Sequence, residues 1–282
     1  MKNKTMKKLK TLVALLFVSS MLAQSPWTKK KNEAYLQLSF TTISNYDELF
    51  GNPDYATERK ITDNTLQVYA EYGITDKTTF FGNIPLKMVK SGDLVTQSLL
   101  PFTTASSETS LGNIQLGVKH NFYNKKWLLS GQLGIEANTS SYKNAAGLRT
   151  GYDAWTFTPL FLVGRGFNNW YIQAFTGFDV RTNDYSSNYK LGGEVGYKAI
   201  DWLWIAGFLD GVASLKNGDR VDTIANRLTG LYVNNQSYAA FGLKLIGEIN
   251  KSFGANVGLG GALGGRNVAK KPAISFGLYY KL

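Results

Sequence analysis

Residues 66–74 read LQVYAEYGI, and apolar side chains alternate with more polar ones along the whole stretch. Val68 and Ile74 would share one face of an extended strand, whereas Gln67 and Glu71 would share the opposite face. A period of two residues is typical of a β-strand that separates two different environments. We therefore predict a strand here with one apolar and one polar face.

The same alternation recurs along the chain, in segments separated by links rich in Asn, Asp, Ser, Thr and Gly. Such segments are typical of transmembrane barrels, in which outward side chains contact lipid and inward side chains line a polar lumen. We predict an all-β fold, a closed transmembrane antiparallel β-barrel of about twelve strands with a polar lumen. The predicted strands span residues 34–44, 64–74, 78–90, 110–123, 127–139, 154–166, 169–182, 187–198, 202–214, 237–249, 253–264 and 272–282.

The lengths of the links support this prediction independently. Short links follow the even-numbered strands, at residues 75–77, 124–126, 167–168, 199–201 and 250–252. The longest links lie between them, at residues 45–63, 91–109, 140–153 and 215–236. Outer-membrane barrels alternate short periplasmic turns with longer external loops. The pattern therefore predicts external long links and two periplasmic termini.

The N-terminus predicts export. Residues 1–23 contain five lysines, then the apolar run Leu12–Val18, and end on Ala23. This run is too short to span a bilayer as a helix, which needs about 20 apolar residues. We expect residues 1–23 to be a signal peptide that is cleaved before Gln24. Residues 24–33 would form a periplasmic tail or a lumen plug, and a position of Trp27 inside the bore would indicate the plug. Residues 34–282 would form the barrel.

Charge and cysteine content exclude several classes of function. The chain has 31 Lys and Arg against 20 Asp and Glu, and removing the five signal lysines leaves 26 against 20, a net charge of +6. Beyond Lys29–Lys31 there is no compact basic run, so the chain lacks the electrostatic footprint of a nucleic-acid-binding protein. It contains no cysteine, which excludes disulfides and thiolate metal sites.

Residues 72–86, YGITDKTTFFGNIPL, and residues 110–120, SLGNIQLGVKH, resemble the outer-membrane proteins of the meta-pathway phenol-degradation family. In that family a YG(I/L)TD turn leads into a strand ending in an (L/I)P step, and a later strand begins with GxGD and ends in GxKY. Asn113 stands here where the family has Asp, and His120 where it has an aromatic residue, so the match is partial. The resemblance covers the second to fourth predicted strands. It implies a barrel that passes aromatic or other hydrophobic small molecules across the outer membrane.

His120 is the single histidine, so any Ser-His-Asp arrangement would depend on it. Alternation places it with Leu116 and Val118 on the lipid-facing side. An outer-membrane phospholipase would need a serine two positions later, where this chain has Phe122. A general base without a nucleophile has nothing to activate. We therefore predict no catalytic residue, no cofactor, no metal site and no enzymatic activity.

Alternation directs a set of ionisable side chains of both signs into the lumen. These candidate lumen-lining residues are Glu71, Lys87, Lys119, Glu136, Asp179, Arg181, Lys190, Glu194, Lys244 and Glu248. An ion-paired interior that stiffens the wall is generic to barrels, and a selective pore lining is the sharper hypothesis. Pro85 and Pro159 lie inside predicted strands and cannot donate to the ladder, so they mark candidate lateral gaps.

The expected function is a channel that passes small hydrophobic or aromatic compounds by passive diffusion. The alternative is a structural or surface-adhesion barrel without transport, whose long loops, especially residues 215–236, are its functional part. A continuous lumen or a side opening would favour transport, and paired inward charges would favour the structural role. We expect a monomer in the outer membrane of a Gram-negative bacterium. Its expected partners are outer-membrane lipid and lipopolysaccharide, the barrel-assembly machinery and a small hydrophobic or aromatic solute.

Overall fold

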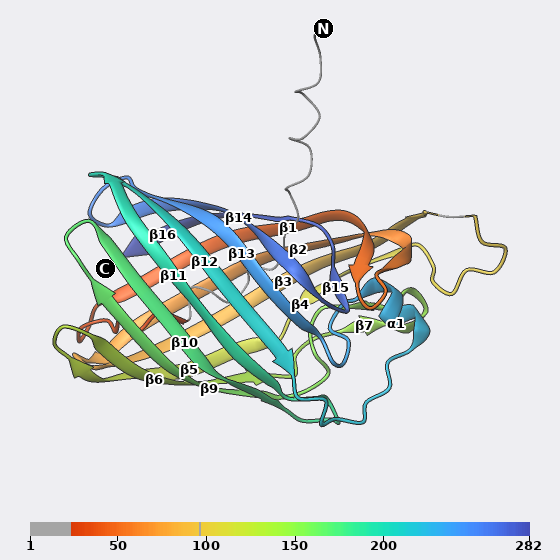
Figure 1. The fold of residues 1–282 in the computed structure, drawn as a ribbon, viewed down its shortest axis with the longest axis horizontal. Coiled ribbons are helices and arrows are strands. Elements are labelled where there is room, and N and C mark those ends of the chain that lie inside the picture. Colours follow the sequence, from red (N-terminus) through yellow and green to blue (C-terminus); the bar gives the residue numbers. More distant parts are fainter. Residues whose placement is uncertain (1–23, 96) are drawn as a thin grey trace, which may run out of the picture.

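A computed structural model describes residues 24–95 and 97–282, and within them the chain forms a closed antiparallel barrel (Figure 1). The wall consists of β1 (Ala34–Phe50), β2 (Tyr55–Thr75), β3 (Thr78–Leu94), β4 (Ser106–Leu111), β5 (Ile114–Asn124), β6 (Leu128–Ala137), β9 (Thr156–Gly166), β10 (Trp170–Arg181), β11 (Asn188–Ile200), β12 (Leu203–Ser214), β13 (Ser237–Glu248), β14 (Phe253–Arg266) and β16 (Ala273–Lys281). β4 and β5 occupy one place in the wall because both pair with β3. β1 pairs with β2 and with β16, which closes a barrel of 12 strands, as predicted.

The faces of the strands follow the alternation of the sequence. On β2, Val68 and Ile74 are exposed on the outside of the barrel, while Gln67 and Glu71 are buried. Exposed apolar side chains recur in this way around the wall, which gives the barrel the outer surface that lipid requires. β9 has a nearly continuous apolar sequence, and the structure resolves its facing: Leu160 and Leu162 are buried.

The predicted boundaries fail most clearly at the first hairpin. Residues 45–63 were expected to be an external link, but β1 and β2 continue through most of this segment and leave a turn at residues 51–54. β2 is 21 residues long, whereas a tilted strand crosses a bilayer in about 9–11 residues. The hairpin therefore extends well beyond the thickness of a membrane. The register of β1 shifts on either side of Tyr46, close to Asn45, which has a positive φ of 52°.

Two of the other long links contain short elements. Residues 140–153 hold β7 (Tyr142–Lys143), a 3₁₀ turn (Asn144–Ala146) and β8 (Leu148–Arg149), and β15 (Val268–Ala269) lies before β16. Residues 215–236 hold the helix α1 (Ile224–Thr229), which we did not predict. Its start is capped by the Thr223 hydroxyl, which accepts from the Asn226 N–H, and it ends at Gly230 with a φ of 68°.

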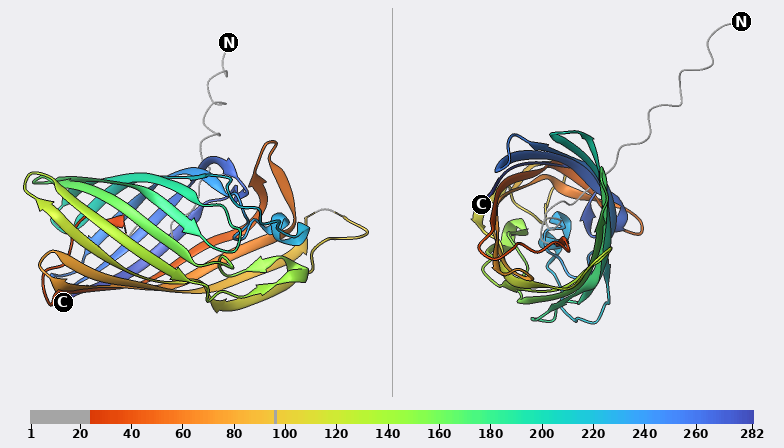
Figure 2. Two further views of the ribbon diagram at one scale, coloured as in Figure 1. Left: turned by 90° about the horizontal axis from the view of Figure 1, so that it is seen from below. Right: turned by 90° about the vertical axis from the view of Figure 1, so that its left-hand side faces the viewer.

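These elements gather at one end of the barrel, while the short turns and the C-terminus lie at the other (Figures 1 and 2). At the loop end, Tyr46 and Leu49 of the long hairpin pack in one apolar cluster with Leu148, Leu231 and Val268. This cluster explains why the polar hairpin sequence stays extended, since the buried residues hold it against the inward-folded loops. No helix among the described residues is long and apolar enough to cross a membrane. The predicted signal peptide, residues 1–23, lies outside the described residues.

Candidate functional site in the barrel interior

The interior of the barrel contains a cavity of about 210 Å³. Its wall is formed by inward side chains of β1, β2, β3, β5, β6 and β9 to β13. Gln24, from the N-terminal segment, and Leu231 and Tyr232, from the loop that carries α1, also contribute to the lining. The cavity is therefore bounded both by the sheet and by two segments that lie inside it (Figure 2).

The N-terminal segment contacts the inner wall near the short-turn end. The Lys119 Nζ donates to the Ser25 carbonyl at 2.9 Å, and the Ser130 hydroxyl donates to the Pro26 carbonyl at 2.7 Å. The Trp27 ring meets Tyr171 of β10 edge to face, with 5.8 Å between the ring centroids. Gly164 of β9 is required here, because a Cβ at this position would lie 2.5 Å from Pro26 Cγ.

Several of the predicted lumen residues line the cavity. Lys87 pairs with Asp63 at 2.5 Å, donates to the Thr65 hydroxyl at 2.9 Å and lies 5.4 Å from the centroid of the Tyr232 ring. A second group lies on β10 and β11, where Arg181 and Lys190 approach Asp179 at 3.5 and 3.6 Å. Glu136 also lines the cavity, and the described residues give its carboxylate no ion pair within 4.0 Å.

The other predicted lumen residues lie nearer the short turns. Glu71 is buried between Lys119, at 3.0 Å, and Lys29, at 3.4 Å. Lys244 and Glu194 form a buried pair at 2.6 Å. Glu248 is less enclosed: it pairs with Lys281 at 3.0 Å, and 37% of its side chain is exposed. The inward charges are thus mostly compensated within the barrel.

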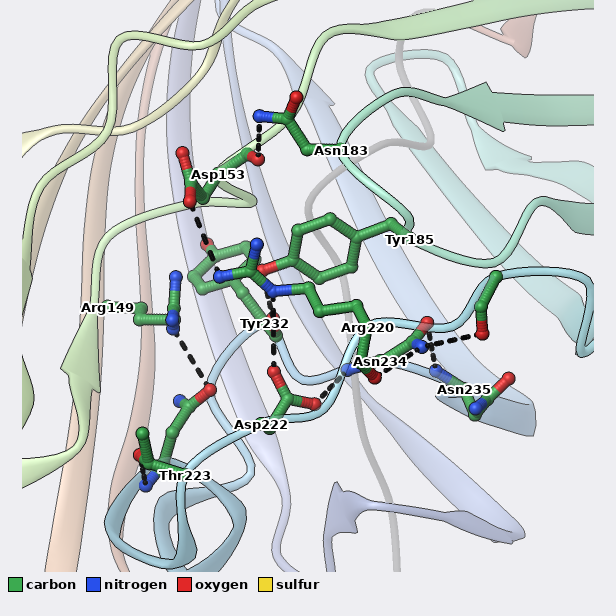
Figure 3. Close-up of polar contacts among 12 residues, drawn as sticks. Arg149, Asp153, Asn183, Tyr185, Arg220, Asp222, Thr223, Tyr232, Asn234 and Asn235 are labelled. Carbon is green, nitrogen blue, oxygen red and sulfur yellow. Dashed lines mark hydrogen bonds and ion pairs between the residues drawn. The ribbon is translucent and has the colours of Figure 1, made fainter.

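A polar network holds the loops together at the other end (Figure 3). Arg220 pairs with Asp153 at 3.3 Å and lies 4.4 Å from the centroid of the Tyr185 ring. The Asp222 carboxylate accepts from the backbone N–H of Asn234 at 2.6 Å. We call residues 220–234 the loop cap, because this segment carries α1 and contributes Tyr232 to the cavity.

The loop cap is fixed to the 3₁₀ turn of residues 144–146 through Asn226. Its side-chain Nδ2 donates to the carbonyls of Gly147, at 3.2 Å, and Leu231, at 2.8 Å, while its Oδ1 accepts from Arg149 Nε at 2.9 Å. Gly147 has a φ of 66°, and a Cβ there would lie 2.1 Å from the Ala225 carbonyl oxygen. Glycine at this position therefore permits the close approach of the two loops.

Tyr152, which precedes β9, joins the loops to the cavity. Burial raises the pKa of its phenol well above the ordinary value, so the group stays protonated and donates to Gln236 Oε1 at 2.6 Å. The Arg181 guanidinium lies 3.9 Å from the centroid of the same ring. Sequence alternation did not identify Tyr152 or Tyr232, because both lie in links rather than in strands.

The two candidate gap prolines lie in different surroundings. Pro85 of β3 faces the break between β4 and β5, and its carbonyl accepts from the Gly112 N–H at 2.8 Å. The edge of β4 that faces away from β3 pairs with no described strand. Side chains of residues 139–150 form hydrogen bonds with it instead, such as the Thr150 hydroxyl, which donates to the Leu111 carbonyl at 2.9 Å. Pro159 of β9 is exposed, and the ladder keeps its register past it.

His120 is exposed and points away from the cavity. Its Nδ1 lies 2.9 Å from the Thr78 hydroxyl. No described carboxylate forms an ion pair with its ring, so this His and hydroxyl pair lacks the third group of a catalytic triad. Among the described residues, no group of three or more His, Cys, Asp and Glu side chains could hold a metal ion.

No family model and no curated protein matches this sequence. Among solved structures, the COG4313 outer-membrane channel of Pseudomonas putida F1 aligns with a TM-score of 0.67 over 90% of this chain and 97% of that one, at 13% identity. The NanC porin aligns with a TM-score of 0.54 over 88% and 100% of the two chains, at 8% identity. The translocator domain of the autotransporter NalP from Neisseria meningitidis aligns with a TM-score of 0.54 over 90% and 89%, at 10% identity. The chain thus has the fold of outer-membrane barrels, including channels and porins.

Proposed function

We propose that this chain is a gated outer-membrane channel through which small hydrophobic or aromatic compounds diffuse passively. The observation that carries the proposal is the cavity of about 210 Å³ inside the barrel. Gln24 and Tyr232 contribute to its lining from two segments that are not part of the wall. The cavity thus lies between the wall and two segments inside the barrel, which is the arrangement that a gated path through the lumen requires.

The N-terminal segment, residues 24–33, is the proposed inner gate and acts as a lumen plug. Residues 29–33 are tied to β2 and β3, for example by the Lys29 N–H on the Thr79 hydroxyl at 2.7 Å, so the part proposed to move is residues 24–28. The contacts of residues 25–27 with the wall are two side-chain hydrogen bonds and one ring contact. A net hydrogen bond contributes about 0.5–1.5 kcal/mol, so these contacts can break without unfolding the barrel. The loop cap, residues 220–234, is the proposed outer gate.

The proposed lateral route lies at Pro85. At the loop end of the wall, no ladder of backbone hydrogen bonds joins β4 to β6. Side chains of residues 139–150 cover the gap between these two strands. Moving them would open the cavity towards the hydrocarbon of the membrane, where an apolar solute partitions favourably. Pro159 is the weaker candidate, because the strand register is unchanged there.

The second candidate function is a structural or surface-adhesion barrel without transport. The inward ion pairs favour it, since Lys87, Lys119 and Lys244 each have a carboxylate partner within 3.0 Å. Such pairs fill the lumen and stiffen the wall. In either function we propose cleavage after Ala23, periplasmic termini, and a monomer inserted by the barrel-assembly machinery among lipid and lipopolysaccharide.

Uptake by whole cells tests the channel, because an intact lipopolysaccharide layer slows the direct entry of apolar compounds. We would measure the initial uptake of labelled toluene by Gram-negative cells that carry or lack the chain. The channel predicts faster uptake with the wild-type chain. Equal uptake by both strains, with the barrel folded and inserted, would favour the structural role.

A further inference from the structure

One wall of the cavity carries four carboxamide side chains on β2, β3, β5 and β6. These residues, which we call the amide belt, are Gln67, Asn83, Gln115 and Gln132. Asn83 and Gln115 face each other across the β3–β5 ladder. Among the described residues, none of the four side chains has a hydrogen-bond partner. The belt therefore presents neutral donors and acceptors to the cavity.

Burial makes this hydrogen-bonding capacity significant. Asn83 Oδ1, Gln132 Oε1 and the nearby Asn113 Oδ1 are buried acceptors without a partner among the described residues. The orientation of the Asn113 amide is set by its Nδ2, which donates to the Tyr152 carbonyl at 2.9 Å. Buried polar groups are almost always satisfied by protein, water or ligand. A ligand that donates hydrogen bonds would satisfy these oxygens.

Most of the charged lining residues are already paired. Glu136 is the exception among the described residues, and its carboxylate can accept a hydrogen bond from a ligand hydroxyl. Lys87 is occupied by Asp63 and Thr65, and Asp179 is shared by Arg181 and Lys190. A second charged group would have to break one of these pairs and lose solvation as well. A neutral ligand avoids both costs. Hydroxyl groups fit the amide belt because, like carboxamides, they both donate and accept.

The remaining lining indicates the size and body of the ligand. Tyrosine rings at positions 46, 69, 152, 232 and 238 contribute flat apolar surface to the cavity. An apolar cavity of about 150 Å³ binds benzene, so a space of about 210 Å³ holds a substituted six-membered ring. The amide belt and the tyrosines together provide polar contacts at one wall and apolar contacts around it.

We infer that the cavity is a binding site for compact neutral ring compounds that carry hydroxyl groups, which bind the amide belt while tyrosines contact the ring. This inference rests on the proposed function, and it names the class of solute that the same cavity selects. Purely apolar solutes would leave the buried amide oxygens unsatisfied and would bind more weakly.

Calorimetric titration of the mature protein in lipid nanodiscs tests the inference, with empty nanodiscs as the blank. The probes are toluene, benzyl alcohol and 1,3-benzenedimethanol, which share a ring and differ in the number of hydroxyl groups. We expect Kd to fall about tenfold with each hydroxyl. Asn83→Leu and Gln115→Leu should each weaken the diol about tenfold and leave toluene unchanged. Gln173→Leu is the matched control, because Gln173 donates to Glu194 and does not line this cavity.

The Kd values of the three probes for the wild-type protein test the inference even if a variant fails to fold. Toluene binding as tightly as the diol would overturn the inference, and so would the absence of binding by every probe, which would indicate a cavity filled by water. Either result is distinguishable from failure of the channel itself, because uptake of toluene by cells is measured separately. If Gln173→Leu raised the Kd of the diol as much as Gln115→Leu does, the proposed role of the amide belt would also be contradicted.

Discussion

Lys119 shows how a charge is kept inside this barrel. Its side chain is fully buried, and its Nζ contacts the Glu71 carboxylate at 3.0 Å and the Ser25 carbonyl at 2.9 Å. Removing one member of a buried ion pair leaves the other uncompensated, which destabilises proteins by about 3–5 kcal/mol. We expect Lys119→Met to lower the free energy of unfolding by about 3 kcal/mol, because Lys29 still contacts Glu71. Urea unfolding in lipid vesicles, followed by gel mobility, measures it.

Two further variants separate the effect of the buried ion pair from the general effect of removing a lysine. Lys77→Met removes an exposed lysine from the β2–β3 turn and should leave stability unchanged. Adding Glu71→Gln to Lys119→Met should recover part of the lost stability, because the double variant no longer buries a Glu71 carboxylate that has lost its Lys119 partner. A double variant less stable than Lys119→Met alone would contradict the role of the pair.

Asp54 at the tip of the long hairpin predicts a pH dependence. Its carboxylate accepts from Lys270 Nζ at 2.8 Å and from the Gly51 N–H at 3.1 Å, and these bonds, chiefly the one from Lys270, lower the pKa of Asp54. A lowered folded-state pKa adds stability above the unfolded pKa, and this stability is lost as the pH falls through the folded value. We expect Asp54→Asn to speed amide hydrogen exchange at residues 49–55 near pH 7 and to have little effect near about pH 2.

Asp47→Asn, on the same hairpin, is the control for this measurement. No hydrogen bond or ion pair of the Asp47 side chain occurs among the described residues, so its exchange should match the wild type at both pH values. An Asp54→Asn effect of equal size at acid and neutral pH would show that the carboxylate charge is irrelevant.

At the scale of elements, the loop cap depends on one side chain. Asn226 is 2% exposed and bonds both the Gly147 carbonyl and Arg149. Asn226→Ala leaves these buried groups unsatisfied, so we expect the cap to open more often and trypsin to cleave after the exposed Arg227 about tenfold faster. Asp219→Ala, at an exposed position in the same loop, should not change the rate.

The N-terminal segment gives a second prediction at this scale. Gln24 is 4% exposed, whereas Lys30 is exposed near the short-turn end. In a chain without cysteines, Gln24→Cys should react with a maleimide at least about tenfold more slowly than Lys30→Cys in the folded barrel. Equal rates would mean that the segment does not stay in the lumen.

Alternation predicted the wall well, because each strand separates lipid from the interior and the period of two follows directly from that separation. It failed where other contacts decide the structure. The segment 45–63 is polar enough for a loop, yet Tyr46 and Ile61 bury against Leu148 and Leu231 from distant loops, and this packing keeps it extended. The break at Gly112 and the helix α1 depend on loop contacts in the same way.

Across the whole molecule, the inward facing of the charged residues could be predicted from parity, but their pairing could not. Lys244 and Glu194 lie on β13 and β11, with β12 between them, so their contact depends on the curvature and tilt of the closed wall. The amide belt follows the same parity as Glu71 and Lys119. It was overlooked because neutral side chains give no charge signal in a sequence.

Single-channel conductance in a planar bilayer tests the gated channel most directly. We would compare the mature chain with a variant that lacks residues 24–28 and add small aromatic compounds to one side. The gated channel predicts brief or small openings for the mature chain, larger steady openings for the truncated one, and block of both by the aromatic compounds. Two folded barrels that remain silent, or equal conductance that the compounds leave unchanged, would contradict it.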